Sequence, residues 1–204
     1  MQTFVVRVWL PDRPGALGQV ATRIGAAGAD VVGIEILERG GGNAIDELTV
    51  AVGDPSMIDQ LVAEIGQVDG VAVEDVRAVA AGRPDHGTVA LELAAELVHT
   101  DPGDLAAALC AGVCDLVDGD WAVTVSVVGD VTAAVGSPPE SAWVAAFVEG
   151  SRHLSAVHES TPGDIAWAHL PRRATTVVAG RSGRVFHARE RQQVHLVGRI
   201  VDAM

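Results

Sequence analysis

The sequence predicts a mixed α+β chain of two domains, and three observations lead to this fold class. The first 79 residues carry strand and helix patterns in the order strand, helix, strand, strand, helix, strand. Residues 80–87, AAGRPDHG, lose this periodicity and gather glycine, proline and aspartate, as linkers do. The rest of the chain has helix patterns at both ends and strand pairs between them. We therefore predict one domain over residues 1–80, a linker over 81–87 and a second domain over 88–204.

The first strand and helix are indicated by two different periods of hydrophobic residues. Residues 3–10, TFVVRVWL, alternate in the manner of a half-buried strand. Over residues 14–27 the apolar positions fall at i, i+3, i+4 and i+7, which makes one stripe of a helix. Pro14 suits the first turn of that helix, where its missing N–H costs nothing, and Gly28 ends it.

The remaining elements of the first domain follow from turn signals. Strands over 30–39 and 43–52 are joined across three glycines, as in a hairpin. A helix over 55–66 begins with Pro-Ser and ends on glycine, and a last strand covers 70–79. This order predicts a four-stranded antiparallel sheet with both helices on one face.

The second domain is predicted from weaker periodicity. Its expected helices cover residues 88–98, 102–116, 140–155 and 187–203, and its expected strands cover 121–128, 131–136, 164–170 and 175–180. The layout is α+β, with terminal helices that can pack together.

Composition narrows the class of partner. The 204 residues are 49% hydrophobic and 20% charged, with a net charge of −13, which disfavours a nucleic-acid partner because backbone phosphates need cations. All basic residues are arginine, and this bias fits a GC-rich bacterial genome. No apolar run approaches the roughly 20 residues that span a bilayer, and the N-terminus reads directly as a strand. We expect a cytoplasmic protein without a membrane partner.

The turn Asp-Arg-Pro-Gly, between the first strand and the first helix, is the candidate binding feature. The N-terminus of a helix leaves N–H groups without partners and carries a partial positive charge, which suits a carboxylate. Gly15 and Ala16 have little or no side chain to block approach to these groups. Asp12 and Asp30 can accept hydrogen bonds from an α-amino group. The turn is therefore predicted to hold a small zwitterion.

The stretch LPDRPGALGQVA, residues 10–21, together with the βαββαβ order and a strand opening on Ala-Asp-Val, resembles the ACT domain, a small regulatory module with a ferredoxin-like fold. The resemblance covers about residues 3–79. It implies that two such domains pair and hold an amino-acid effector between them, near the first strand–helix loop and the start of the second strand. The candidate ligand-binding residues are Asp12, Arg13, Pro14, Gly15, Ala16, Leu17, Asp30 and Val31.

Besides ligand binding, a second interpretation of this region stays open, in which no effector binds. ACT domains that bind amino acids often carry asparagine where this chain has Asp12 and Asp30, and two carboxylates cannot donate to an anion unless they are protonated. Asp12 would then cap the helix, Asp30 would be an exposed strand start, and the ACT-like domain would only assemble a dimer.

The second domain is more weakly similar to GAF-like sensory domains, through residues 164–202 with their strand pair, Gly-Arg-x-Gly turn and long last helix. Trp121, Trp143 and Trp167 are either core residues or the lining of a pocket.

Other chemistry finds little support. The seven histidines, including His153 and His158 five residues apart, show no metal-ligand spacing, so neither a metal nor a cofactor is predicted. Cys110 and Cys114 are expected to be core residues of a cytosolic protein. No nucleophile and base stand together, and the acidic pairs Asp46/Glu47 and Asp118/Asp120 are expected on solvated faces or turns.

Arginine is concentrated near the C-terminus. Residues 172–199 hold seven arginines and one acidic residue. Loop arginines there are predicted to form either a solvated face or a patch for an anion or another subunit; they are Arg172, Arg173, Arg181 and Arg184.

The whole sequence is thus read as a homodimeric sensor without catalytic residues. A small-molecule effector would change the pairing of two chains, and a separate protein partner would receive the signal. The alternative is a structural or interaction protein.

Overall fold

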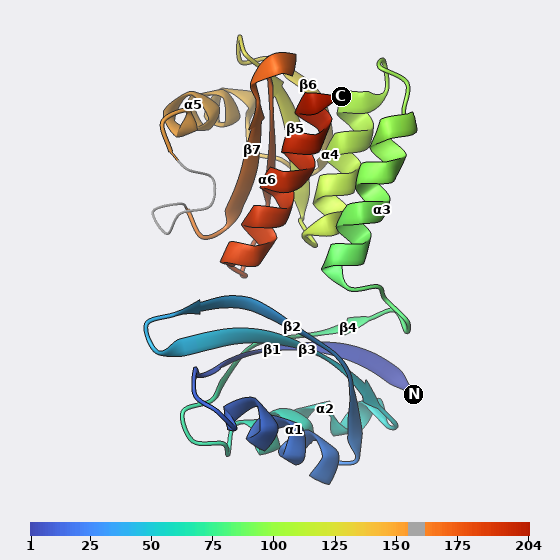
Figure 1. Cartoon of the computed structure of the whole chain (residues 1–204), viewed down its shortest axis with the longest axis vertical. Helices are drawn as coiled ribbons and strands as arrows, with labels where there is room; N and C mark the ends of the chain where they lie inside the picture. The colour runs from blue at the N-terminus through green and yellow to red at the C-terminus, as the bar shows by residue number, and fades with distance from the viewer. Residues whose placement is uncertain (155–161) are drawn as a thin grey trace. The chain divides into compact units, whose positions relative to one another are not determined.

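The computed structural model describes residues 1–154 and 162–204 (Figure 1). The chain divides into two compact units, Met1–Asp85 and His86–Met204, each with its own sheet and helices. Within the described residues, no helix combines the length and the hydropathy needed to cross a lipid bilayer. The predicted α+β fold class is confirmed.

The N-terminal unit has the predicted order of elements. They are β1 (Gln2–Pro11), α1 (Ala16–Ala26), β2 (Ala29–Gly40), β3 (Asn43–Val52), a short 3-10 turn (Pro55–Met57), α2 (Ile58–Ile65) and β4 (Ala72–Val79). The strands form one antiparallel sheet in the order β2-β3-β1-β4, so β1 lies in the interior of the sheet and β2 forms one edge.

Strand alternation puts one hydrophobic face of this sheet under the two helices. Val6 and Val8 of β1 are fully buried beside Val20 and Ile24 of α1 and Leu61 of α2. Figure 1 shows α1 and α2 on the same side of the sheet. The predicted two-layer packing is confirmed.

Helix α1 begins two residues later than predicted. Gly15 has a φ of 88°, in the left-handed region, and this conformation cannot continue a helix. Pro14 therefore lies in the β1–α1 loop rather than in the first helical turn, and the helix starts at Ala16.

The C-terminal unit is also a sheet with helices, but it is covered on both faces. Its helices are α3 (His86–His99), α4 (Leu105–Leu116), α5 (Ser141–Ser151) and α6 (Ala188–Ala203). Its strands are β5 (Trp121–Ser126), β6 (Val131–Gly136), β7 (Ile165–Leu170) and β8 (Thr175–Gly180), in the antiparallel order β6-β5-β8-β7. The two strand pairs are joined along β5 and β8.

The two faces of this second sheet differ in side-chain size. The face under α3, α4 and α6 carries small residues such as Ala122, Ala166 and Ala168, while Val123 and Trp167 point to the face under α5. Figure 1 shows the sheet between these two helical layers. The terminal helices α3 and α6 contact each other as predicted. The resemblance to a GAF-like domain stays a prediction.

Two tryptophans of this unit are core residues. Trp121 and Trp167 are buried, whereas Trp143 is 45% exposed and stacks on Phe147 with ring centroids 5.7 Å apart. Phe147 in turn meets Trp167 edge-on at 5.2 Å. The predicted helix over 140–155 ends at Ser151, and residue 155 lies outside the described residues.

Close packing of α6 on β7 gives the first testable prediction. A Cβ added at Gly198 would lie 2.5 Å from the Cβ of Ala168, so Gly198→Ala should destabilise the protein by about 1–3 kcal/mol. Gly150→Ala is the matched control, because that glycine has no atom near its missing Cβ and lies in α5; alanine there should be neutral or stabilise by up to about 1 kcal/mol. Urea unfolding measures both. Equal stability of the two variants would contradict the close helix–strand approach.

Candidate functional site

The β1–α1 loop lies open at one end of the N-terminal sheet. Residues 12–15 are all exposed, and Ala16, the first residue of the helix, is buried. Gly15 is the N-cap, and no side chain forms a capping hydrogen bond. Asp12 therefore does not cap the helix, and the capping role that the sequence left open for it is wrong.

Three backbone amides at this helix start have no hydrogen-bond partner among the described residues: those of Gly15, Leu17 and Gly18. The amide of Ala16 donates to the Arg13 carbonyl at 3.2 Å, and that of Gln19 donates to the Gly15 carbonyl at 3.0 Å. Unpaired amides at a helix N-terminus carry partial positive charge and point toward solvent or a ligand. This arrangement fits an anionic group such as a carboxylate.

The β2–β3 hairpin closes the loop from one side. The Asp12 amide donates to the Gly42 carbonyl at 2.9 Å, and the Arg39 Nε lies 4.0 Å from the Asp12 Oδ1. Both side chains are largely in water, with 42% of Asp12 and 58% of Arg39 exposed. A cation and an anion are thus available beside the free amides.

Asp46 of β3 adds a buried carboxylate to this end of the sheet. It pairs with Val8 in the register of β1 and β3, on the helix-covered face that also carries Leu48 and Val50. The residue is 3% exposed, and its Oδ1 has no hydrogen-bond partner within the described residues. Burial raises the pKa of the Asp46 carboxyl, Arg39 lowers it, and Asp12 raises it further.

The burial of Asp46 contradicts the prediction that the pair Asp46/Glu47 is solvated. The signal was present in the sequence, because every second residue of β3 around Asp46 is hydrophobic. A polar residue in phase with a buried stripe is a candidate functional group, since burying an unpaired carboxylate is costly.

Asp30 and Val31 lie far from the loop within one chain. Asp30 pairs with Ala51, whose partner on β1 is Thr3, while Asp12 follows the last residue of β1. Nine residues along β1 separate the position of Thr3 from that of Asp12. At roughly 3.3 Å per residue, Asp30 therefore lies about 30 Å from Asp12. Asp30 is exposed and Val31 packs against the core. A single copy does not bring the eight candidate residues together.

A hollow of about 360 Å³ lies next to the loop, between α1 and the segment after α2. It is polar, and Arg13 links it to the loop. Its side chains include Arg23, whose Nη1 donates to Glu64 Oε2 at 3.2 Å and to Gln67 Oε1 at 3.0 Å. The lining residues are Arg13, Gln19, Thr22, Arg23, Gln67, Val68 and Asp69.

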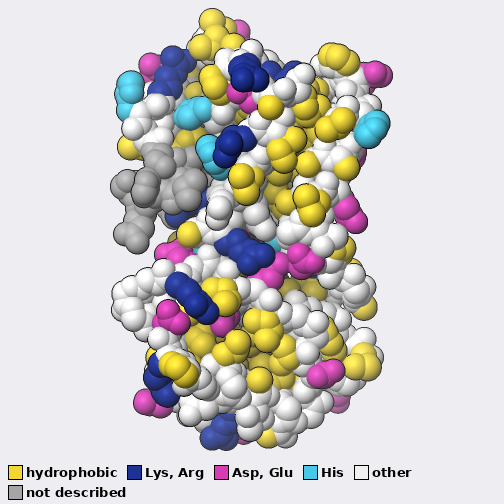
Figure 2. Space-filling model, in the orientation of Figure 1, with side chains coloured by type: hydrophobic (Ala, Val, Ile, Leu, Met, Phe, Trp, Pro, Cys, Tyr) yellow, Lys and Arg dark blue, Asp and Glu magenta, His cyan; other side chains and the backbone are white. Residues whose placement is uncertain are grey.

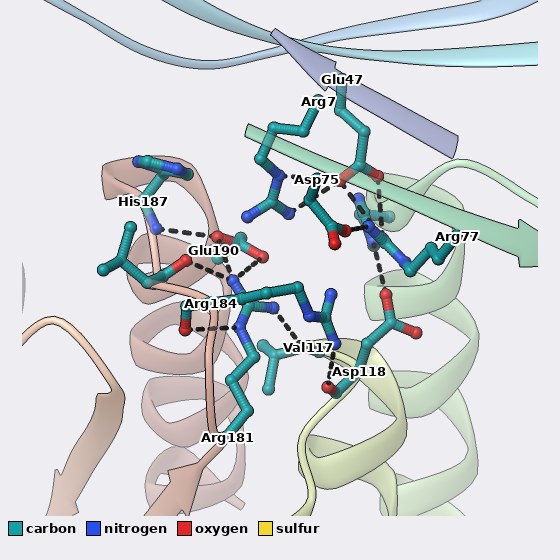
Figure 3. Close-up of polar contacts among 12 residues, drawn as sticks. Arg7, Glu47, Asp75, Arg77, Val117, Asp118, Arg181, Arg184, His187 and Glu190 are labelled. Atoms are coloured by element: carbon teal, nitrogen blue, oxygen red, sulfur yellow. Dashed lines mark hydrogen bonds and ion pairs between the residues drawn. The ribbon is translucent and has the colours of Figure 1, made fainter. Parts of the chain in front are cut away.

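Glu47 points to the sheet face opposite to that of Asp46 and belongs to an ionic network. Its Oε2 accepts from Arg7 Nη2 at 2.7 Å and from Arg77 Nη2 at 3.2 Å, and Arg77 Nη1 also donates to Asp75 Oδ2 at 2.9 Å (Figure 3). The expectation of a solvated Glu47 is wrong, because β1 and β4 bring two arginines to it. These contacts fix the strands together and leave no obvious free group.

The predicted arginine surface of the C-terminal unit is also corrected. Arg181 is buried: its Nη2 lies 2.8 Å from Glu190 Oε1, and its Nη1 donates to the Val117 carbonyl at 2.7 Å. Figure 3 shows the Arg181 and Glu190 side chains directed at each other. Arg181 thus joins the β8–α6 loop to the end of α4, and it forms neither a solvated face nor an anion patch.

The other polar groups of this region have structural contacts. Asp120 Oδ2 accepts from the Ser182 amide at 2.7 Å, and Arg184 Nη2 donates to the Asp118 carbonyl at 3.2 Å. The Arg173 Nε donates to the Val201 carbonyl at 2.7 Å. These contacts hold loops to helix ends.

The C-terminal unit has a hollow of its own, of about 330 Å³, between α5 and the β7–β8 turn. His169 lies in its wall with Nδ1 2.9 Å from Thr176 Oγ1 and Nε2 3.3 Å from the Ser151 carbonyl. The lining residues are Val127, Val148, Arg152, His169, Leu170, Pro171, Ala174, Thr175 and Thr176. No tryptophan lines this hollow. Its polar groups contact one another, so it is a weaker candidate than the β1–α1 loop.

Among the described residues, no three metal-ligating side chains come together, and His158 lies outside those residues. Cys110 and Cys114 are free and buried, as predicted. Burial, followed by the neighbouring Cys114, raises the pKa of the Cys110 thiol to about 11, so it stays protonated and unreactive at neutral pH.

The buried carboxyl of Asp46 predicts a pH-dependent stability. Its pKa is raised above 3.8 in the folded protein, so the folded state holds this proton more tightly than the unfolded state. The stability that this proton gives is present below pH 3.8 and is lost as pH rises through the folded value. We expect Asp46→Asn to gain stability over the unmodified protein as pH increases across that window. Urea unfolding at several pH values measures the difference, and a pH-independent difference would show that Asp46 is well solvated.

Comparison with known proteins bears on the N-terminal unit. Residues 4–70 match the family model of the ACT domain. No curated protein matches the chain.

Similar solved structures cover different shares of the chain. The ACT domain from GTP pyrophosphokinase of Chlorobium tepidum is 18% identical, with a TM-score of 0.31, over 38% of this chain and 97% of that chain. The C-terminal domain of the MgtC protein from Mycobacterium tuberculosis is 23% identical, with a TM-score of 0.34, over 42% and 95%. A protein provisionally assigned as a glycine cleavage system transcriptional repressor is 13% identical, with a TM-score of 0.35, over 89% and 82%.

The family match agrees with the βαββαβ order and with the sheet order of the N-terminal unit. Residues 4–70, within the N-terminal unit, are therefore an ACT domain.

Proposed function

We propose that the protein is a homodimeric sensor that binds an amino acid or a similar small zwitterion at its ACT domain and acts on a separate protein partner. The role is regulatory rather than catalytic. The observation that carries this proposal is the exposed β1–α1 loop, with three unpaired amides beside Asp12 and Arg39. These groups offer donors for a carboxylate and an acceptor for an ammonium group.

The edge strand β2 supports pairing of two copies. It is 12 residues long and has only one neighbour, β3, so its outer edge can accept another strand. Val32 and Ile34 on β2 are 57% and 47% exposed, and Figure 2 shows hydrophobic side chains at the surface of the N-terminal unit. An exposed hydrophobic edge is a pairing surface.

Antiparallel pairing of two β2 strands would also unite the candidate site residues. If the two-fold axis passes beside Ile34, Asp30 of the partner subunit lies opposite Glu38, the neighbour of Arg39. Arg39 is 4.0 Å from Asp12, so the partner's Asp30 would come to the end of the sheet that carries the β1–α1 loop, which it does not reach within its own chain. The separation of Asp30 from Asp12 is then a property of a site shared between two copies.

In this arrangement the effector touches both copies and favours the paired state. It shifts the equilibrium only by its difference in affinity for the two states. The C-terminal unit would respond to the change in pairing. Its two buried free thiols fit a reducing compartment, and we place the protein in the cytoplasm.

A ligand screen tests the sensor proposal. One amino acid present at about 100 times its Kd should stabilise the folded protein by about 2.7 kcal/mol, seen as a raised melting temperature. Each of the twenty amino acids is added separately, with sodium chloride at equal ionic strength as the control. A flat screen would favour the alternative, in which the ACT domain only assembles a dimer.

A substitution on the edge strand tests the pairing. Ile34→Glu should convert a dimer to a monomer, because it places like charges across the two-fold axis at a cost of several kcal/mol. Light scattering coupled to size-exclusion chromatography measures the mass. Val128→Glu is the matched control, since Val128 is 78% exposed in a turn of the other unit. A monomeric unmodified protein, or a dimer that survives Ile34→Glu, would contradict pairing through β2.

A further inference from the structure

We propose that the hollow between α5 and the β7–β8 turn is a second ligand site, which takes a small carboxylic acid with an apolar body. The proposal goes beyond the proposed function, because it concerns the C-terminal unit and a different class of ligand. It stands on the frame of the hollow, on its apolar walls and on the donors that Arg152 offers.

The first argument is that hydrogen bonds between three separate segments frame the hollow. The Val127 carbonyl accepts from Arg152 Nη2 at 3.0 Å, and the Val127 amide donates to the Ala174 carbonyl at 2.8 Å. His169 Nε2 lies 3.3 Å from the carbonyl of Ser151, the last residue of α5. The β5–β6 turn, the β7–β8 turn and α5 are thus held to one another. A hollow held in this way exists before a ligand arrives, so binding requires little ordering of the protein.

The second argument is the size and the apolar character of the space. Its volume of about 330 Å³ lies at the lower end of the range for small-molecule sites. A smaller hollow of about 180 Å³ shares Val127, Val148 and Arg152 with it and continues over the β5–β6 turn. Val148 and Leu170 are buried in the wall of the larger hollow, whereas Val127 is 54% exposed. These walls fit a small apolar body, and the removal of that body from water favours binding.

The third argument is that the polar groups of the wall leave one set of donors for a ligand. His169 Nδ1 lies 2.9 Å from Thr176 Oγ1, and Thr175 Oγ1 donates to the Arg173 carbonyl at 3.0 Å. Arg152 differs from them, because its Nη1 has no hydrogen-bond partner among the described residues. A guanidinium binds a carboxylate through its N–H groups, and Nη1 supplies two of them.

The charge of the lining selects an anion. Among the described residues, those that line the larger hollow include Arg152 and no carboxylate. Glu149 lines the smaller hollow and has an oxygen 3.0 Å from Arg152 Nε, but 71% of its side chain is exposed, so water screens this ion pair. An ammonium group in the larger hollow would meet the guanidinium with no acid beside it. The hollow therefore favours a monocarboxylate over an amino acid.

Binding of small probes tests this inference. The probes are benzoate, the neutral benzyl alcohol and acetate, which separate the contribution of the charge from that of the apolar body. Isothermal titration at neutral pH measures each probe with the unmodified protein and with three variants. Arg152→Gln removes the guanidinium, and Val127→Trp fills the space from a position that is largely exposed. Arg199→Gln is the matched control, since Arg199 is an exposed arginine of α6, which covers the other face of the sheet.

The expected result is a loss specific to the carboxylate. Benzoate should bind the unmodified protein more tightly than either other probe. Arg152→Gln should weaken benzoate binding by about tenfold or more, because a charge-assisted hydrogen bond is lost, and should leave the weaker binding of benzyl alcohol unchanged. Val127→Trp should weaken the binding of both, because its side chain occupies their space. Arg199→Gln should bind every probe as the unmodified protein does.

Several results would overturn the proposal. Absence of benzoate binding by the unmodified protein would exclude a carboxylate site, and equal binding of benzoate and benzyl alcohol would remove the role of Arg152. Benzoate binding that is unchanged in both Arg152→Gln and Val127→Trp would place the carboxylate elsewhere, for example on the unpaired amides of α1. None of these results bears on amino-acid binding by the ACT domain, which the ligand screen measures separately.

Melting temperatures of the ligand-free variants separate a lost site from a damaged fold. Arg152→Gln and Val127→Trp alter the hollow by different means, so both should lose benzoate binding while their melting temperatures stay near that of the unmodified protein. A loss of binding that appears only together with a lowered melting temperature would make these residues structural and would overturn the proposal.

Discussion

The reversal of the chain between Pro11 and Ala16 is the constraint on which the proposed site depends. Strand β1 reaches the end of the sheet at Pro11, and α1 must then run back across one face of the same sheet. Gly15 makes this turn in the left-handed region, at a φ of 88°, without any side chain that caps the helix. The first amides of α1 therefore remain unpaired. A capping side chain would satisfy one of them and would reduce the attraction of this helix end for an anion.

Topology decides which groups can join that helix end. Strands β1 and β2 run in the same direction with β3 between them, so the start of β2 lies at the far end of the sheet from the β1–α1 loop. Asp30 therefore cannot complete the site of its own chain. Asp46 lies nearer to that loop, because β3 begins at the loop end, where Asn43 pairs with Pro11. The direction of each strand thus decides which residues lie at the loop end within one copy.

Periodicity was sufficient to predict most of the elements of the fold, because burial against one face imposes it directly. The βαββαβ order, the hairpin at 40–42 and the strand pairs of the C-terminal unit follow from alternation and turn residues. The start of α1 was misplaced, because Pro14 suits a first helical turn in general and only the conformation of Gly15 excludes it. Asp46 and Arg181 were misjudged for a different reason. Their burial depends on neighbours distant in sequence, and a charge was read as a sign of exposure.

The register of β1 has a consequence for synthesis of the chain. Thr3 pairs with Ala51 on one side and with Val79 on the other, so this residue waits for a partner that lies more than seventy positions later in the chain. The hairpin of β2 and β3 needs no such delay, since its strands are joined by two residues. On the ribosome the nascent N-terminal unit would hold a formed hairpin and an incomplete sheet until β4 leaves the exit tunnel. During that interval the side of β1 that later pairs with β4 is unpaired. Two nascent chains on one mRNA could pair with each other there instead of with their own β4.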